Sequence, residues 1–202
     1  MLGWNPSTFP GFDACPVEAV SWYEAVDYCN ALSEREDRTP AYELDGTSVT
    51  WDPAANGYRL PTESEWEYAC RAGTTTAFYS GPITKPRCEL AWNLDRIGWY
   101  CGNNGEVGDP DYGTKEGGQK VPNAWGLYDA SGNVWEWCWD WYGDYPAGPV
   151  TDPTGPDSGS SRIFRGGSWL SYADNGRSAY RVRFAPDYRG NHLGFRPAIS
   201  SP

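Results

Sequence analysis

Residues 165–196 read RGGSWLSYADNGRSAYRVRFAPDYRGNHLGFR, and this is the most informative stretch of the chain. Some of its positions have the composition of a rigid frame: Arg165, Gly166, Gly167, Trp169, Arg177, Arg181, Pro186, Arg189, Gly194, Phe195 and Arg196. Chemically assorted aromatic and polar residues lie between these positions. A rigid frame that carries such a mixed surface is typical of a binding face. The stretch therefore predicts ligand recognition.

Length and charge limit the classes of function. At 202 residues the chain fits one domain, 1–202, in which the Pro-, Gly- and Ser-rich segment 146–161 is expected to be a surface loop. Sixteen basic against 27 acidic residues give a net charge of −11. A nucleic-acid footprint needs clustered Lys and Arg, so we expect no nucleic-acid partner and no binding to anionic membranes.

No window resembles a transmembrane span, and no membrane insertion is expected. The start, residues 1–9, has neither a charged n-region nor an apolar core, so no signal peptide is predicted and the compartment stays open. Six cysteines show no CxxC spacing, which argues against zinc. Cys29 and Cys70 fall on predicted helix faces and are expected to pack as small apolar side chains. Cys88 and Cys101 flank one irregular segment and are either bonded to each other or free.

Two helices are well signalled. Ser21 with Glu24 forms a capping-box pattern before a helix to about Glu34. Thr62 with Glu65 opens a second helix, which ends at Gly73. Asp-Gly at 45–46 and Asn-Gly at 56–57 predict hairpin turns.

Beyond residue 73 the helical periodicity disappears, and short extended runs are separated by long loops. They cover 126–128, 134–139, 162–165, 179–184 and 193–197. Trp135, Trp137, Trp139 and Trp141 alternate, which places four indoles on one strand face; we expect core rather than an open surface. The fold class is therefore α+β, with two helices, a mainly antiparallel sheet and long irregular loops.

Seven segments in a fixed order carry a family resemblance. They are NPS (5–7), PVEAVSW (16–22), YRLPTESEWEYA (58–69), NAWGLYD (123–129), GNVWEW (132–137), RGGSW (165–169) and LGFR (193–196). They resemble the formylglycine-generating enzyme (sulfatase-modifying factor) family over nearly the whole chain. The resemblance implies a C-type-lectin-like fold. The strand region that normally precedes the NPS motif in the family is missing, so we expect a short form or a fragment.

The resemblance also bears on catalysis. The family's enzymes oxidise a substrate cysteine with two cysteines five residues apart that hold copper, in a segment similar to 179–184. Here these positions are Ala179 and Phe184, and neither forms a thiolate, so no copper site and no such enzyme is expected. Iron-dependent sulfoxide synthases of the family need several histidines, whereas this chain has only His192. Two alternatives stay open: a relative of the oxidoreductases with unrecognised chemistry, and an accessory domain with one fixed partner.

A non-catalytic branch offers a different use of the fold. Variable proteins of diversity-generating retroelements are similar to this family and bind ligands through a C-terminal region shaped like RGGSW…GFR. Adenine-directed mutagenesis there produces many residues but not Gln, Glu, Lys, Met or Trp. The candidate variable positions, all compatible with it, are Leu170, Ser171, Tyr172, Asp174, Asn175, Tyr180, Val182, Arg183, Phe184, Ala185, Tyr188, Gly190, Asn191 and His192. The resemblance thus implies a protein or surface ligand.

This interpretation makes two predictions about side chains. The aromatic set, Tyr172, Tyr180, Phe184 and Tyr188, is expected to cluster on one exposed surface. The arginine set, Arg177, Arg181, Arg189 and Arg196, is expected to be largely buried, paired with Asp174, Asp187 or backbone carbonyls.

The resemblance further implies structural calcium. Carried over residue by residue, the ligands are the carboxylates of Asp129 and Glu136 and the carbonyls of Gly132 and Val134. A second site would use Asn93 and Leu94 with a later acid such as Asp109, in a segment that departs from the family pattern.

Overall fold

The computed structural model describes residues 5–9 and 14–199, so that residues 1–4, part of the start used for the signal-peptide prediction, lie outside it. Helix α1, Trp22–Arg35, and helix α2, Glu63–Arg71, both begin where the sequence predicts. At Ser21 the hydroxyl accepts the Glu24 N–H and the Glu24 carboxylate accepts the Ser21 N–H; Thr62 and Glu65 repeat this arrangement. Both capping boxes are therefore confirmed.

Of the two predicted hairpins, one forms. Strands β1, Tyr42–Asp45, and β2, Ser48–Trp51, pair antiparallel around Gly46, whose φ is +60°. The Asn56–Gly57 prediction is wrong: β3, Tyr58–Arg59, pairs instead with β8, Ala198–Ile199, near the other end of the chain. The turn is tied to the end of α1, because the Ser33 hydroxyl accepts the Tyr58 N–H at 2.7 Å. A Cβ on Gly57 would lie 2.3 Å from the Thr39 carbonyl oxygen, so glycine is required by this close approach.

The central sheet has the order β6-β5-β4-β7: Val182–Phe184, Arg162–Arg165, Trp135–Trp141 and Leu193–Phe195. Its pairs are antiparallel except β4 with β7, which is parallel. That exception to the expected antiparallel sheet arises because residues 166–192, which include β6, carry the chain across the sheet before β7 begins beside β4. No strand forms at 126–128, and of the run 179–184 only the last three residues are strand. Helix α3, Trp92–Asp95, and a 3₁₀ turn at Ala173–Gly176 were not predicted.

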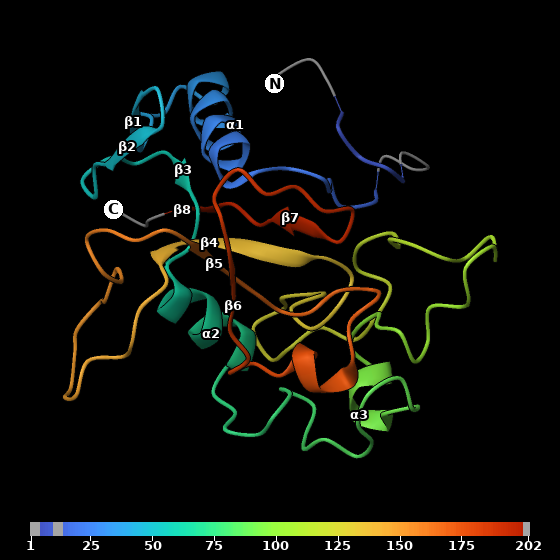
Figure 1. The fold of residues 1–202 in the computed structure, drawn as a ribbon. Coiled ribbons are helices and arrows are strands. Elements are labelled where there is room, and N and C mark those ends of the chain that lie inside the picture. Colours follow the sequence, from blue (N-terminus) through green and yellow to red (C-terminus); the bar gives the residue numbers. More distant parts are fainter. Residues whose placement is uncertain (1–4, 10–13, 200–202) are drawn as a thin grey trace.

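The sheet lies between two layers (Figure 1). On one side α1 and the β1–β2 hairpin cover Trp135 and Trp137, which are buried together with Trp22. Trp139 packs against the same cluster, so three of the four alternating tryptophans are core as predicted, whereas Trp141 is half-buried and lies outside the cluster. On the other side α2 packs against the opposite face of β4, where Cys138 and Ile163 are buried with Trp66.

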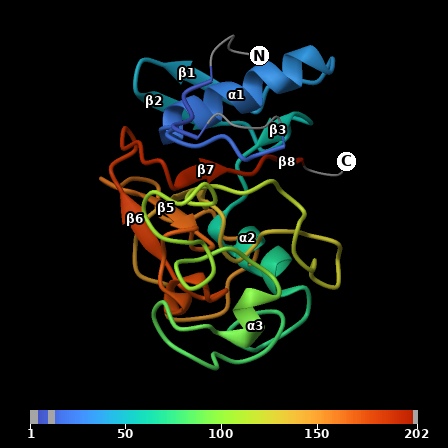
Figure 2. The same ribbon diagram turned by 90° about the vertical axis from the view of Figure 1, so that its right-hand side faces the viewer.

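A third cluster lies in the loop region around α3 (Figure 2). It buries Phe78, Leu94, Ile97 and Tyr100. Cys88 and Cys101 are joined by a disulfide that closes this region. No helix in the described part of the chain is long and apolar enough to cross a membrane.

Candidate binding face and the pocket beside it

The frame of residues 165–196 is anchored by a buried arginine. Arg165 is fully buried, and its guanidinium contacts the carboxylates of Glu63, at 2.8 Å, and of Glu67 on α2. Gly167, with φ +80°, follows it; a Cβ there would lie 3.0 Å from the Cα of Gly176. The first residues of the predicted frame are therefore fixed in two ways. Arg165 is held by its ion pairs, and Gly167 allows its backbone to lie directly against that of Gly176.

The rest of the frame is held by a tryptophan and a second glycine. Trp169 is buried, and its indole N–H donates to the Asn191 carbonyl at 3.1 Å, which joins the start of the candidate variable region to its end. A Cβ on Gly194 would lie 2.3 Å from the Val17 carbonyl oxygen. Substitution at Trp169 or Gly194 would therefore disturb the frame itself.

Thirteen of the fourteen candidate variable positions are exposed or half-buried. Ser171 is the correction: it is 8% exposed, and its hydroxyl accepts the Ser168 N–H and contacts the Ser168 hydroxyl. It thus belongs to the frame and not to the surface. The most exposed aromatic positions are Tyr172 at 53% and Phe184 at 47%.

Three aromatic positions gather near β6. The rings of Phe184 and Tyr188 stack with centroids 4.1 Å apart, and Tyr180 lies 6.1 Å from Trp135. We call Tyr180, Phe184 and Tyr188 the aromatic cluster. The cluster is continuous with the core through Trp135. One side of it therefore packs against buried residues, and the other side faces the surface.

Tyr172 belongs to another part of the surface. Its neighbours form the 3₁₀ turn beside α3, the orange turn in Figure 1. There the Ala173 N–H donates to the Arg87 carbonyl, and the Arg87 N–H donates to the Asp174 carboxylate. The single surface expected for the aromatic set is therefore divided into the aromatic cluster and a separate turn.

The arginine set is paired, but its carboxylate partners are not the predicted Asp174 and Asp187. Arg181 binds Glu63, Arg196 binds Glu136, and Arg189 binds Glu24. The predicted backbone carbonyls are partners as well: Arg177 donates to that of Asp174, Arg181 to that of Gly143 and Arg196 to that of Tyr128. The glutamates come from elements outside the 165–196 stretch, which spacing within that stretch could not reveal.

Burial of the arginine set is confirmed only in part. The Arg181 side chain is 16% exposed and that of Arg196 33%, whereas Arg189 is 54% exposed and lies on the surface. Its partner, Glu24 in the first turn of α1, is 19% exposed, so that Arg189 covers this carboxylate from the outside.

The two positions at which the resemblance leads us to expect cysteines in an active enzyme carry no thiol here. Ala179 is exposed and Phe184 belongs to the aromatic cluster. Three cysteines are buried elsewhere, and burial raises the thiol pKa to about 12 in Cys29 and to about 11 in Cys70. These thiols stay protonated near neutral pH, so they pack as the sequence predicts.

The only histidine also lies on the candidate face. His192 is half-buried, and burial lowers its pKa below the ordinary value. Its ring lies 6.3 Å from that of Tyr188, next to the aromatic cluster. Its ring therefore favours the neutral form near pH 7 and lies within the candidate face.

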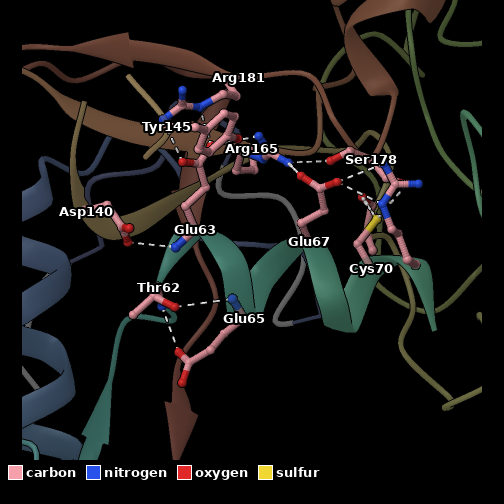
Figure 3. A network of polar contacts seen from close by, with 12 residues as sticks. Thr62, Glu63, Glu65, Glu67, Cys70, Asp140, Tyr145, Arg165, Ser178 and Arg181 are labelled. Carbon is pink, nitrogen blue, oxygen red and sulfur yellow. Dashed lines mark hydrogen bonds and ion pairs between the residues drawn. The ribbon is translucent and has the colours of Figure 1, made fainter. Parts of the chain in front are cut away.

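A pocket of about 930 Å³ opens beside β6. It is lined by α2, the end of β4 and the 143–156 loop, and residues 165–196 contribute only Ala179 and Arg181. Figure 3 shows the network of polar contacts next to it: Arg165, which is buried behind the lining, lies between Glu63 and Glu67, and Arg181 approaches Glu63 from the other side.

Sequence reasoning missed this pocket. Glu63 and Glu67 have the i, i+4 spacing of one helix face, and Asp140 alternates with the core tryptophans of β4. These spacings were the available signal that the three carboxylates lie on the side of β4 opposite its core tryptophans. Nothing in the sequence showed that the 143–156 loop folds over them.

The first predicted calcium loop is occupied by an arginine. Glu136 is 4% exposed; Arg196 donates to both its oxygens, and the Trp66 indole N–H donates to Oε2 at 2.7 Å. Asp129 accepts the Gly118 N–H and has a second carboxylate oxygen that is buried without a hydrogen bond. Its carboxyl pKa is raised, mainly by burial. The Arg196 guanidinium thus serves as the cation of Glu136, whereas one oxygen of Asp129 has no partner, and calcium at this loop stays a prediction.

The second predicted site is also organised by protein groups. The Leu94 carbonyl accepts the Ile97 and Gly98 N–H groups, and the Asn93 amide donates to the Pro82 carbonyl. Asp109 accepts the Glu106 N–H in an exposed turn. No cluster of three or more His, Cys, Asp or Glu side chains suited to a metal occurs among residues 5–9 and 14–199.

The family model described as the sulfatase-modifying factor enzyme 1-like domain matches residues 4–201. The chain is 36% identical to the chaperone protein LppX of Paenibacillus barcinonensis, over 97% of this chain and 73% of that one. It is 38% identical to the formylglycine-generating enzyme of Thermomonospora curvata, over 91% of this chain and 55% of that enzyme. The chain thus spans about half the length of that enzyme.

Among solved structures, the Treponema denticola variable protein 1 is similar with a TM-score of 0.85. The two are 35% identical, and the match covers 98% of this chain and 78% of the other. The expected α+β fold class and the family resemblance are confirmed by this likeness and by the family match.

Proposed function

Since the chain belongs to the sulfatase-modifying factor enzyme 1-like family, we propose that it is a non-catalytic member that binds a protein or surface ligand through the exposed positions of residues 170–192. The observation that carries the proposal is the split between frame and surface. Arg165, Trp169 and Ser171 are buried and hydrogen-bonded, whereas the thirteen other candidate positions reach the surface. Such a region accepts side-chain changes without losing its backbone shape.

Catalytic silence rests on chemistry. A copper-dependent oxidation of cysteine needs thiolates at positions 179 and 184, and alanine and phenylalanine supply none. Similarity to the variable protein of Treponema denticola supports a binding use of the same fold.

Two experiments test the proposal. The first incubates the purified chain with copper and a cysteine-containing sulfatase peptide, with the Thermomonospora curvata enzyme as positive control. We expect the peptide mass to stay unchanged with this chain. Conversion of the cysteine to formylglycine would instead support the alternative of an oxidoreductase with unrecognised chemistry.

The second experiment concerns the origin of the surface. For a retroelement-diversified protein, we expect the flanking DNA to hold a reverse-transcriptase gene and a near-copy of the 3′ end of the coding sequence. The two copies should differ at adenines of the template, at codons for the thirteen positions. Flanking DNA without that pair would favour an accessory domain with one fixed partner.

A further inference from the structure

The 930 Å³ pocket is separate from the candidate variable positions. None of the fourteen lines it. In β6 the side chains alternate: Val182 packs with the core below the aromatic cluster, whereas the Arg183 guanidinium lies 4.1 Å from the ring of Tyr142 on the other side. Arg181 projects to this second side and lines the pocket. The pocket therefore keeps its composition when the binding face varies.

The cations of the pocket are already in use. Arg181 donates to both oxygens of Glu63, at 2.6 and 2.7 Å. Arg71 pairs with Glu67 at 2.8 Å and donates to the Thr76 carbonyl. An anionic ligand would have to break these pairs, so the pocket does not favour one.

One buried carboxylate in the pocket forms no ion pair. Asp140 is 4% exposed and forms no ion pair with any residue among 5–9 and 14–199. Its Oδ2 accepts the Glu63 N–H at 2.7 Å. Gly155 covers it closely, since a Cβ there would lie 3.1 Å from Asp140 Oδ1. Asp144 and Asp152 lie in the same lining, are exposed and add negative charge at its rim.

The remaining walls are apolar and aromatic. Tyr68, Trp141, Tyr145 and several prolines of the 143–156 loop line the cavity. The Tyr145 ring already holds the Arg181 guanidinium 4.1 Å from its centroid, which is the geometry of a cation–π contact. The volume lies within the range of pockets that enclose a ligand of peptide-fragment size.

We propose that this pocket binds an alkylammonium group on an apolar stem, with Asp140 as its counter-ion. The stem lies against the aromatic and proline walls, and the ammonium meets the carboxylate that has no cation of its own. Both a lysine side chain of a peptide and a free diamine carry this chemistry. The site is independent of the proposed binding face, because it shares no candidate variable position with it.

Binding is expected to depend on pH. Burial, and then the nearby Glu63 carboxylate, raises the pKa of Asp140 to about 7. The other charged groups that act on Asp140 are Glu65 on α2 and Arg162 on β5. Because an ammonium pairs with the ionised carboxylate, the affinity should weaken as the pH falls below 7.

Calorimetric titration of the full chain at pH 8 tests the proposal. The probes are Nα-acetyl-lysine amide, pentane-1,5-diamine and, as a neutral control of similar length, Nα-acetyl-norleucine amide. We expect the lysine amide to bind at least about tenfold more tightly than the norleucine amide, since an ion pair in a partly buried site is worth roughly that factor. Tighter binding of the lysine amide than of the diamine would identify a peptide side chain as the ligand, and the reverse order a free amine.

Three variants localise the binding. Asp140→Asn keeps an acceptor for the Glu63 N–H and should weaken both cationic probes about tenfold. Ala179→Phe fills the pocket and should abolish their binding. Asp27→Asn removes the same charge on the exposed surface of α1 and should change nothing. Melting curves check that each variant is folded.

Equal binding of lysine and norleucine amides, unchanged binding by the Asp140→Asn variant, or no binding of either cation at about 10 mM would each overturn the proposal. None of these outcomes bears on the 170–192 face. Conversely, flanking DNA without a template copy would contradict the proposal of diversification and would not affect the proposal about the pocket.

Discussion

Glu63 and Arg181, from α2 and from the residue before β6, form a two-point ion pair: Nε lies 2.6 Å from Oε1, and the second guanidinium nitrogen lies 2.7 Å from Oε2. The fully buried Arg165 donates to the same Oε1 at 2.8 Å. One glutamate on α2 thus fixes two arginines of the 165–196 stretch. The candidate face owes its shape to a helix that lies about 100 residues earlier in the chain.

Removing Arg181 should therefore destabilise the domain. Arg181→Met leaves the buried Glu63 with one cation instead of two, and we expect a loss of roughly 2–4 kcal/mol in the free energy of unfolding. Arg183→Met is the matched control: Arg183 is exposed and contacts a ring rather than a carboxylate, so the loss should stay below about 1 kcal/mol. Urea unfolding measures both, and equal losses would contradict the role given to Glu63.

The arginines also show what a sequence can and cannot predict. Helix starts were predictable, because a capping box is a local signal in which Ser21 and Glu24 complete each other. The tryptophan face of β4 was predictable because it too is a local signal, in which every second residue points to the same side of a strand. The partners of Arg181, Arg189 and Arg196 were not, since each pairs with a glutamate 60 to 165 residues away.

The same limit explains the errors at Asn56–Gly57 and in the pocket. A turn dipeptide predicts a reversal of the chain, but it does not predict which strand pairs with the strand that follows the turn. Here β3 pairs with β8, which lies near the C-terminal end of the described chain. The cavity exists only because the 143–156 loop covers the ends of α2 and β4. Loop placement follows from tertiary contacts such as that of Gly155 with Asp140, for which local propensity gives no signal.

Ser171 and Tyr172 should respond oppositely to substitution although they are neighbours. Ser171→Ala removes a buried hydroxyl that binds Ser168, and we expect a loss of about 1–2 kcal/mol. Tyr172→Ser changes a side chain that is 53% exposed, and we expect a change within about 0.5 kcal/mol. Thermal unfolding of both variants is the measurement. A larger loss for Tyr172→Ser than for Ser171→Ala would show that the boundary between frame and surface does not lie between these two residues.

Chelation of calcium should leave the stability unchanged. Arg196 supplies the positive charge at Glu136, so that no metal ion is needed there. We expect the same melting temperature with calcium and with an excess of chelator. Arg196→Met should lower the melting temperature, because Glu136 would remain buried with only the Trp66 N–H. A fall on chelation in the unsubstituted chain would show that calcium displaces Arg196 and would restore the ligand set Asp129, Gly132, Val134 and Glu136.

Asp140 should make the stability of the domain fall as the pH rises from about 4 to 7. Its carboxyl pKa is raised by burial from an ordinary 3.8 to about 7 in the folded chain. Between these values the folded state holds a proton that the unfolded state has released, so each pH unit costs up to about 1.4 kcal/mol. Below pH 4 both states are protonated and the cost is absent. The loss therefore approaches about 4 kcal/mol above pH 7, as an upper limit.

Asp140→Asn removes this titration and keeps an acceptor for the Glu63 N–H. The variant should be more stable than the unsubstituted chain at pH 8, by roughly 2–4 kcal/mol, and nearly equal to it at pH 4. Asp27→Asn, on the exposed side of α1, should show no such difference between the two pH values. Urea unfolding at both pH values decides the matter. An Asp140→Asn variant that is less stable at pH 8 than at pH 4, each relative to the unsubstituted chain, would mean that Asp140 already has a cationic partner and that the pocket needs none.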